Sequence, residues 1–197
     1  MTTRATVGAD ERIRLFLALE VPDDATACLV RWSRNELEGG RSLEEFHVTL
    51  AFLGSQPRSA LDGVVELLCG EAAATEPFEL AVVRYRETRS VGMLVLDDRT
   101  GRATDLAGRV QHGLERLGVY ERERRPWLPH VTVLRFRERP RLRPALPPLR
   151  PFAPSGAAAL LSRLHPSGAR YEVLESCPLG SAMPVQGRVR ERMRHEA

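Results

Sequence analysis

Two tripeptides of identical sequence, His47-Val48-Thr49 and His130-Val131-Thr132, constrain this 197-residue chain more than any other feature. Each lies in an apolar run that is typical of a strand, over residues 46–53 and 128–136. Because residues i and i+2 of a strand point to the same face, each tripeptide directs an imidazole and a hydroxyl to one side and its valine to the other. Two copies in similar surroundings predict one site built from two halves of the fold.

The remaining pattern predicts strands and helices in a repeated order. We expect further strands over 14–21, 77–83, 91–96, 157–164 and 171–174, and helices over 23–37, 59–73 and 100–117. The succession of strands and helices that ends in a His-x-Thr strand occurs twice, which we interpret as a diverged internal duplication. The predicted fold is therefore α+β, with two similar lobes of antiparallel-rich sheet backed by helices and related by a pseudo-two-fold axis around a central cleft.

The composition of the two ends and the spacing of the cysteines indicate how the chain is organised. A single bilobal domain is predicted over 11–183, and the polar ends, 1–10 and the arginine-rich 184–197, are expected to be disordered. No apolar run approaches the ~20 residues that cross a bilayer, and the first residues lack the apolar segment of a secretory signal. The cysteines, Cys28, Cys69 and Cys177, have no metal-ligand spacing and are expected to be free thiols. We expect a cytoplasmic monomer.

The chain has no lysine, so all 29 of its Lys and Arg residues are arginine. A biased genome explains the missing lysine, but the clustering is more informative. Arginines flank the second motif on both sides, at positions 122, 124 and 125 before it and 135, 137, 139, 141 and 143 after it. Since a guanidinium binds phosphate through a planar fork, this basic rim favours an anionic substrate, with RNA as the leading candidate.

Two histidines and two hydroxyls suit phosphoryl chemistry at neutral pH. In an in-line displacement the attacking and leaving oxygens lie on opposite sides of phosphorus, so a base and an acid must flank it. One histidine would take a proton from water and the other would protonate the departing ribose oxygen. Thr49 and Thr132 could donate hydrogen bonds to the non-bridging oxygens. Such a reaction requires no metal and no cofactor.

Other kinds of site fit the sequence less well. A zinc site needs a third protein ligand, and neither H-x-H nor H-E-x-x-H spacing occurs. A serine hydrolase would carry a G-x-S-x-G turn, which is also absent. Structural histidines remain an alternative: for one lone motif we would prefer that interpretation, whereas two identical motifs favour function.

Four segments in the same order resemble the RNA 2′,3′-cyclic phosphodiesterases, also called bacterial 2′–5′ RNA ligases, of the two-histidine phosphoesterase superfamily. They are RLFLALEVPDD, FHVTLAFLG, RPWLPHVTVLR and PSGARYEVLESCPL, and the resemblance extends over about 14–180. It implies metal-independent hydrolysis of RNA 2′,3′-cyclic phosphate ends to 2′-phosphomonoesters, with 2′–5′ ligation as the reverse reaction.

The resemblance also implies roles for single residues. His47 corresponds to the proton donor to the leaving 3′ oxygen, and His130 to the proton acceptor that activates water. Thr49 and Thr132 correspond to the threonines that hold phosphate.

Two arginines are predicted to bind substrate, Arg125 from the basic rim and Arg135 from the family pattern. Strict alternation turns Arg135 away from the face of His130, so it needs a bulge or a strand-end twist to reach phosphate. Tyr120 and Trp127 are candidates for stacking on a base, with a core position as the alternative for Trp127. Two further hypotheses stay open: a non-catalytic RNA- or nucleotide-binding module, and the same fold acting on a small cyclic nucleotide phosphate.

Overall fold

The structure is a computed structural model that describes residues 11–165 and 168–180. Its strands are β1 (Arg12–Glu20), β2 (Arg41–Ser42), β3 (His47–Pro57), β4 (Ala81–Glu87), β5 (Val91–Asp97), β6 (His130–Arg135), β7 (Ala157–His165) and β8 (Gly168–Cys177). Its helices are α1 (Asp23–Glu36), a 3₁₀ turn η1 (Arg58–Ala60), α2 (Leu61–Ala73) and α3 (Arg102–Arg116). The ends predicted to be disordered, and residues 181–183 of the predicted domain, lie outside the described residues.

The strands form one antiparallel sheet in the order β4-β5-β6-β3-β1-β7-β8, with β2 paired to β6 beside this path. The predicted α+β class with antiparallel sheet is confirmed. The strands divide into the group β2, β4, β5 and β6 and the group β1, β3, β7 and β8, whereas the internal duplication stays a prediction. Val48, paired with Val131, joins the two groups. The described sheet is thus continuous through the pairing of the two motifs.

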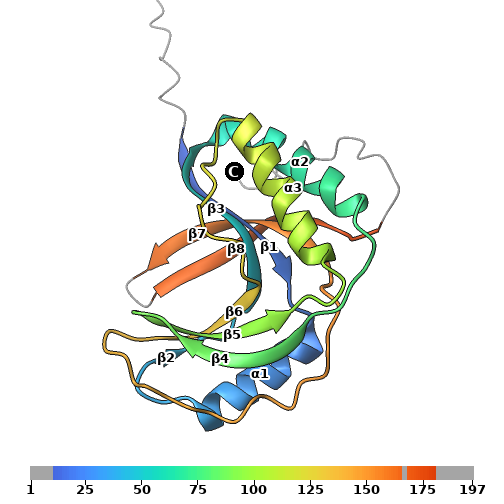
Figure 1. The fold of residues 1–197 in the computed structure, drawn as a ribbon. Helices are drawn as coiled ribbons and strands as arrows, with labels where there is room; N and C mark the ends of the chain where they lie inside the picture. The colour runs from blue at the N-terminus through green and yellow to red at the C-terminus, as the bar shows by residue number, and fades with distance from the viewer. Residues whose placement is uncertain (1–10, 166–167, 181–197) are drawn as a thin grey trace, which may run out of the picture.

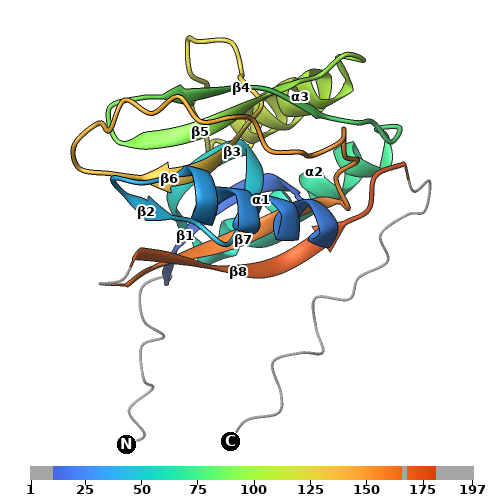
Figure 2. The ribbon, with the colours of Figure 1, turned by 90° about the horizontal axis from the view of Figure 1, so that it is seen from below.

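The helices pack on one face of each strand group and leave the other face free of helices. Figure 1 shows α2 and α3 beyond one group and α1 beyond the other, and Figure 2 shows the same arrangement from below. Leu15, Leu17 and Leu19 of β1 are fully buried in the main core with the inner sides of the helices. Phe16 and Ala18, which alternate with them, belong to a separate small cluster on the opposite face. Both faces of β1 are therefore covered over residues 15–19, which explains the continuous apolar run there.

The predicted boundaries of three strands are wrong. β3 does not end at Gly54 but continues to Pro57, because Gly54 adopts a φ of 68° that bends the strand without stopping it. β4 begins at Ala81 rather than at Pro77, and β8 extends from Gly168 to Cys177, well beyond the predicted 171–174. Among the described residues, no helix is long and apolar enough to cross a membrane.

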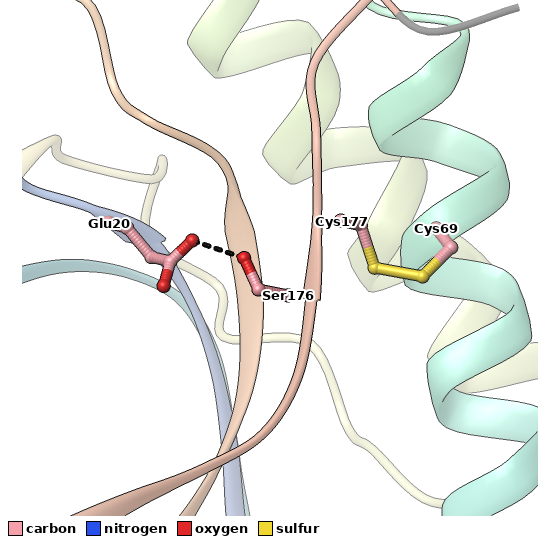
Figure 3. The surroundings of a disulfide bond; sticks show 4 residues. All are labelled: Glu20, Cys69, Ser176 and Cys177. Carbon is pink, nitrogen blue, oxygen red and sulfur yellow. Dashed lines mark hydrogen bonds between the residues drawn. A yellow bond between two sulfur atoms is a disulfide. The ribbon is translucent and has the colours of Figure 1, made fainter. Parts of the chain in front are cut away.

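The prediction of three free thiols is wrong for two of them. Cys69 of α2 and Cys177 at the end of β8 form a disulfide with a Cα–Cα distance of 5.1 Å, across 108 residues of sequence (Figure 3). Only Cys28 is free. The pairing follows from the packing of α2 against β7 and β8, a tertiary contact that cysteine spacing does not reveal.

Candidate active site

The two His-x-Thr motifs meet where the strand groups join. Val48 and Val131 are paired in antiparallel register and are each 1% exposed in the main core. The four motif side chains on the other face, His47, Thr49, His130 and Thr132, are partly exposed. Because the pairing is antiparallel, the histidine of each motif lies toward the threonine of the other.

A β-bulge follows the threonine of each motif. In β3, Leu50 is left unpaired between Thr49, opposite Ala18, and Ala51, opposite Leu17. In β6, Val133 is left unpaired between Thr132, opposite Met93, and Leu134, opposite Gly92. The same irregularity at the same offset in both halves is what a duplication would leave behind.

Each bulge shifts the alternation by one residue, so the residues after it exchange faces. Phe52 and Arg135, each three residues after its motif threonine, therefore share a face with the histidines. Strict alternation is wrong for Arg135, and the bulge that its assignment required is present. The two halves have equivalent backbones here, but one presents an aromatic ring and the other a guanidinium.

A hydrogen bond to the backbone just before β6 orients the ring of His130. Nδ1 lies 2.8 Å from the carbonyl oxygen of Leu128. A carbonyl only accepts hydrogen bonds, so Nδ1 carries a proton, and in the neutral form of the ring the lone pair is on Nε2. In this tautomer His130 can accept a proton at Nε2.

His47 lies in a less polar environment. Its ring is 4.9 Å from that of Phe16 and 5.1 Å, edge-on, from that of Tyr171. Burial, followed by the positive charges of Arg135 and His130, lowers the pKa of His47 from 6.5 to about 4. Without substrate, its imidazole is neutral at pH 7.

A carboxylate on the neighbouring strand could raise the pKa of His47, but it is hydrogen-bonded to another side chain. Glu20 lies directly across from His47 in the pairing of β1 and β3. Its carboxylate accepts a hydrogen bond of 2.5 Å from the hydroxyl of Ser176, the neighbour of the disulfide residue Cys177 (Figure 3). An anion that enters the site is therefore the natural source of negative charge for His47.

We expect the pKa of His47, followed by NMR of its ring protons, to be near 4 in the free protein and to rise when inorganic phosphate or adenosine 2′-phosphate is added. The bound anion favours the imidazolium, so the proton is released at higher pH. Arg135→Gln should raise the pKa in the free protein, because one of the cations that lower it is removed. A pKa that responds to neither change would contradict this electrostatic account.

Other predicted residues have different positions. Arg125 lies in the exposed loop before β6 and donates to the carboxylate of Glu123 at 2.8 Å, and no described contact joins it to either histidine. Trp127 donates its indole N–H to the carbonyl oxygen of Thr49 at 2.9 Å and packs against the main core. Trp127 therefore supports the first motif from the side of the main core, in agreement with the alternative that it is a core residue. Tyr120 also packs against the core.

Three aromatic residues near His47 were not predicted from the sequence. Phe16 and Tyr171 flank the imidazole, and the exposed Phe52 lies 6.5 Å from Phe16 with the guanidinium of Arg14 4.8 Å above its ring. In β1, apolar residues also occupy the positions that alternate with the main-core leucines, and this pattern could have indicated Phe16. No sequence signal pointed to Phe52, because the bulge that turns it to this face depends on the partner strand. Among the described residues, no group of three or more His, Cys, Asp or Glu could hold a metal ion.

Residues 21–165 match the model of the 2′-5′ RNA ligase superfamily. The chain belongs to this superfamily. The predicted family resemblance is thereby confirmed. An RNA 2′,3′-cyclic phosphodiesterase of Geobacillus stearothermophilus is 28% identical over 144 residues, which are 64% of this chain but only 42% of that relative. The chain thus spans less than half the length of this curated superfamily relative.

Two solved structures have a similar fold. The Thermus thermophilus protein TT0787 matches 87% of this chain and 100% of its own, with a TM-score of 0.73 and 27% identity. The apo form of E. coli LigT matches 86% of this chain and 98% of its own, with a TM-score of 0.70 and 24% identity. Their fold supports the α+β arrangement described above.

Proposed function

We propose that this superfamily member hydrolyses RNA 2′,3′-cyclic phosphate ends to 2′-phosphomonoesters with its two motif histidines as acid and base. The observation that carries the proposal is the pair of His-x-Thr strands, each with a bulge at the same offset, on one helix-free face. The name of the Geobacillus stearothermophilus relative, RNA 2′,3′-cyclic phosphodiesterase, supports the same chemistry.

In the proposed mechanism, His130 removes a proton from water at Nε2 while the water oxygen bonds to phosphorus. The bond from phosphorus to the 3′ oxygen breaks, and His47 protonates that oxygen. The hydroxyls of Thr49 and Thr132 and the guanidinium of Arg135 bind the non-bridging oxygens, where negative charge is concentrated. The histidines end with exchanged protonation states and return to their starting states through solvent.

The low pKa of His47 in the free protein fits a donor that is charged by its own substrate. The phosphodiester anion offsets the two cations that disfavour the imidazolium. His47 would then hold its proton mainly when substrate is bound.

The aromatic residues near His47 suggest where the end of the RNA lies. The leaving oxygen belongs to the terminal ribose, so this nucleoside is on the His47 side of the phosphate. Phe52 and Tyr171 are on that side and offer partly exposed rings on which a base can stack. Stacking tolerates every base, so little sequence preference is expected at this position.

We further propose that the protein acts as a cytoplasmic monomer without metal or cofactor. Disulfides are uncommon in reducing compartments, so the Cys69–Cys177 bond by itself argues against the cytoplasm, and this proposal requires that burial shields the bond from reductant. Both cysteines are at least nine-tenths buried.

The test is hydrolysis of adenosine 2′,3′-cyclic phosphate and of an oligoribonucleotide with the same end. We expect equal rates in EDTA and in added Mg²⁺, Mn²⁺ or Zn²⁺, with adenosine 2′-phosphate as the mononucleotide product, identified by chromatography against the 2′ and 3′ isomers. Activity that disappears in EDTA and returns with metal, or a 3′-phosphate product, would contradict the mechanism. Binding without turnover would favour the non-catalytic module, and turnover of the mononucleotide alone would favour a small substrate.

A further inference from the structure

The two sides of the reacting phosphate have different neighbours, if the proposed function holds. The 3′ oxygen and the RNA that carries it lie on the side of His47. The attacking oxygen lies on the side of His130, because displacement is in line. Residues that lie beyond His130, on the side away from His47, therefore face the attacking oxygen and the group attached to it.

Two exposed arginines extend the site on the His130 side. Across β6, β5 and β4, His130 pairs with Val95 and Val95 with Arg84, while Thr132 pairs with Met93 and Met93 with Arg86. Directly paired residues of antiparallel strands point to the same face. Both arginines therefore share the face of the motif residues, about 10 Å from β6 since neighbouring strands are about 4.8 Å apart.

A second group of arginines lies around the edge of β4, beside residues of the opposite face, because Glu87 alternates with Arg86 and points away from the motif residues. A hollow of about 510 Å³ adjoins β4, with Arg86, Arg141 and Arg143 among its lining residues. The lining carboxylate, Glu87, is already satisfied: it accepts hydrogen bonds from Nε of Arg139 at 3.0 Å and from the backbone N–H groups of Arg141 and Leu142. Although burial opposes it, these bonds lower the pKa of Glu87, which is therefore ionised and neutralises Arg139.

We call Arg84 and Arg86, which share the face of the motif residues, the arginine strip. Within the described residues, neither guanidinium group has a hydrogen bond or an ion pair with another side chain. Asp97 lies on the same face of β5, one row beyond His130, and pairs with Arg99. The strip thus offers two uncompensated forks for phosphate. Met93 and Val95, which lie between the strip and the motif, are buried and cannot stack on bases.

We propose that the arginine strip binds the backbone of a second RNA strand whose 5′-hydroxyl takes the place of water. The 5′ oxygen bonds to phosphorus as its proton passes to Nε2 of His130, and the bond to the 3′ oxygen breaks as His47 protonates that oxygen. The product is a 2′–5′ phosphodiester, and no further reactant is required. Water needs no phosphate-binding surface on its side of the site, whereas an RNA strand does.

The reaction is measured most readily in reverse, since both directions pass through the same site. The substrate is an oligoribonucleotide with one 2′–5′ linkage and several nucleotides downstream of it, and cleavage yields a 2′,3′-cyclic phosphate and a 5′-hydroxyl strand. The strip variant is Arg84→Gln with Arg86→Gln. The matched control, Arg31→Gln with Arg116→Gln, removes two exposed arginines from α1 and α3, which pack on the opposite face.

We expect the strip variant to lower kcat/KM for the 2′–5′-linked substrate at least ~10-fold, mainly through KM, and to reduce the slope of log kcat/KM against log salt by about one to two units. Hydrolysis of an RNA that ends in a 2′,3′-cyclic phosphate should stay within about two-fold of wild type. Shortening the downstream segment to one nucleotide should abolish the difference between variant and wild type. The control variant should change neither reaction.

Three outcomes would overturn the assignment. Unchanged cleavage of the 2′–5′ linkage in the strip variant would show that the strip binds nothing in this reaction. Equal losses in cleavage and in hydrolysis of the cyclic-phosphate oligonucleotide would place the strip under the strand that carries the phosphate. A wild-type protein that hydrolyses cyclic phosphate but does not cleave the 2′–5′ linkage would refute the strip proposal alone, whereas absence of both reactions would refute the proposed function as well.

Discussion

Alanine in place of His130 should lower kcat/KM for an RNA 2′,3′-cyclic phosphate by about 10²–10⁴-fold, the usual contribution of a positioned general base. The hydrogen bond from Nδ1 to Leu128 leaves Nε2 as the proton acceptor, and alanine supplies none. His47→Ala should cause a loss of similar size, since the leaving 3′ oxygen would depart without a proton. Steady-state kinetics with an oligonucleotide substrate measure both effects.

The double variant distinguishes catalysis from a general loss of structure. If the two histidines act on one transition state, the double variant should be little slower than either single variant. His112→Ala is the matched control, because His112 is exposed on α3 and should leave the rate unchanged. Circular dichroism should show the same folded spectrum for all four proteins. Near wild-type activity in either motif variant would refute the acid–base roles.

Breaking the Cys69–Cys177 disulfide should lower the free energy of unfolding by about 4–5 kcal/mol, which is a large part of the stability of a typical domain. The bond closes a loop of 108 residues, and opening it restores conformational freedom to the unfolded chain. Urea unfolding with and without a phosphine reductant measures the difference in one protein, without any change of sequence.

The free cysteine provides the control for this measurement. Cys28→Ser should unfold at nearly the wild-type urea concentration and should respond to reductant as the wild type does, because Cys28 is not bonded. In urea without reductant, a thiol reagent should titrate one cysteine in the wild type and none in Cys28→Ser. Titration of three thiols in the wild type, with no effect of reductant on unfolding, would show that the bond does not form.

Local periodicity was sufficient to predict most of the strands and helices and the face of its strand on which each motif histidine lies. Leu106, Val110 and Leu114 recur at helical spacing in the segment predicted as a helix over 100–117, and all three are fully buried on α3. The i, i+2 rule correctly sends Val48 and Val131 into the core and the motif histidines to the other face. These features depend on one strand or helix at a time, so the sequence alone contains the information.

The features that could not be predicted depend on pairs of elements. A bulge is a property of two strands in register, so no pattern within residues 128–136 alone could turn Arg135 to the face of His130. The disulfide and the contact of Tyr171 with His47 likewise join segments that are more than 100 residues apart in sequence. Such contacts follow from the topology of the whole sheet.

The matched bulges also place different side chains at corresponding positions of the two motif strands. Phe52 follows one motif and Arg135 follows the other, at the same offset from the threonine. In the proposed function, these two side chains, rather than the shared strand pattern, distinguish the two ends of the phosphodiester. We therefore expect the direction in which RNA lies in the site to depend on a few side chains that can be changed without changing the fold.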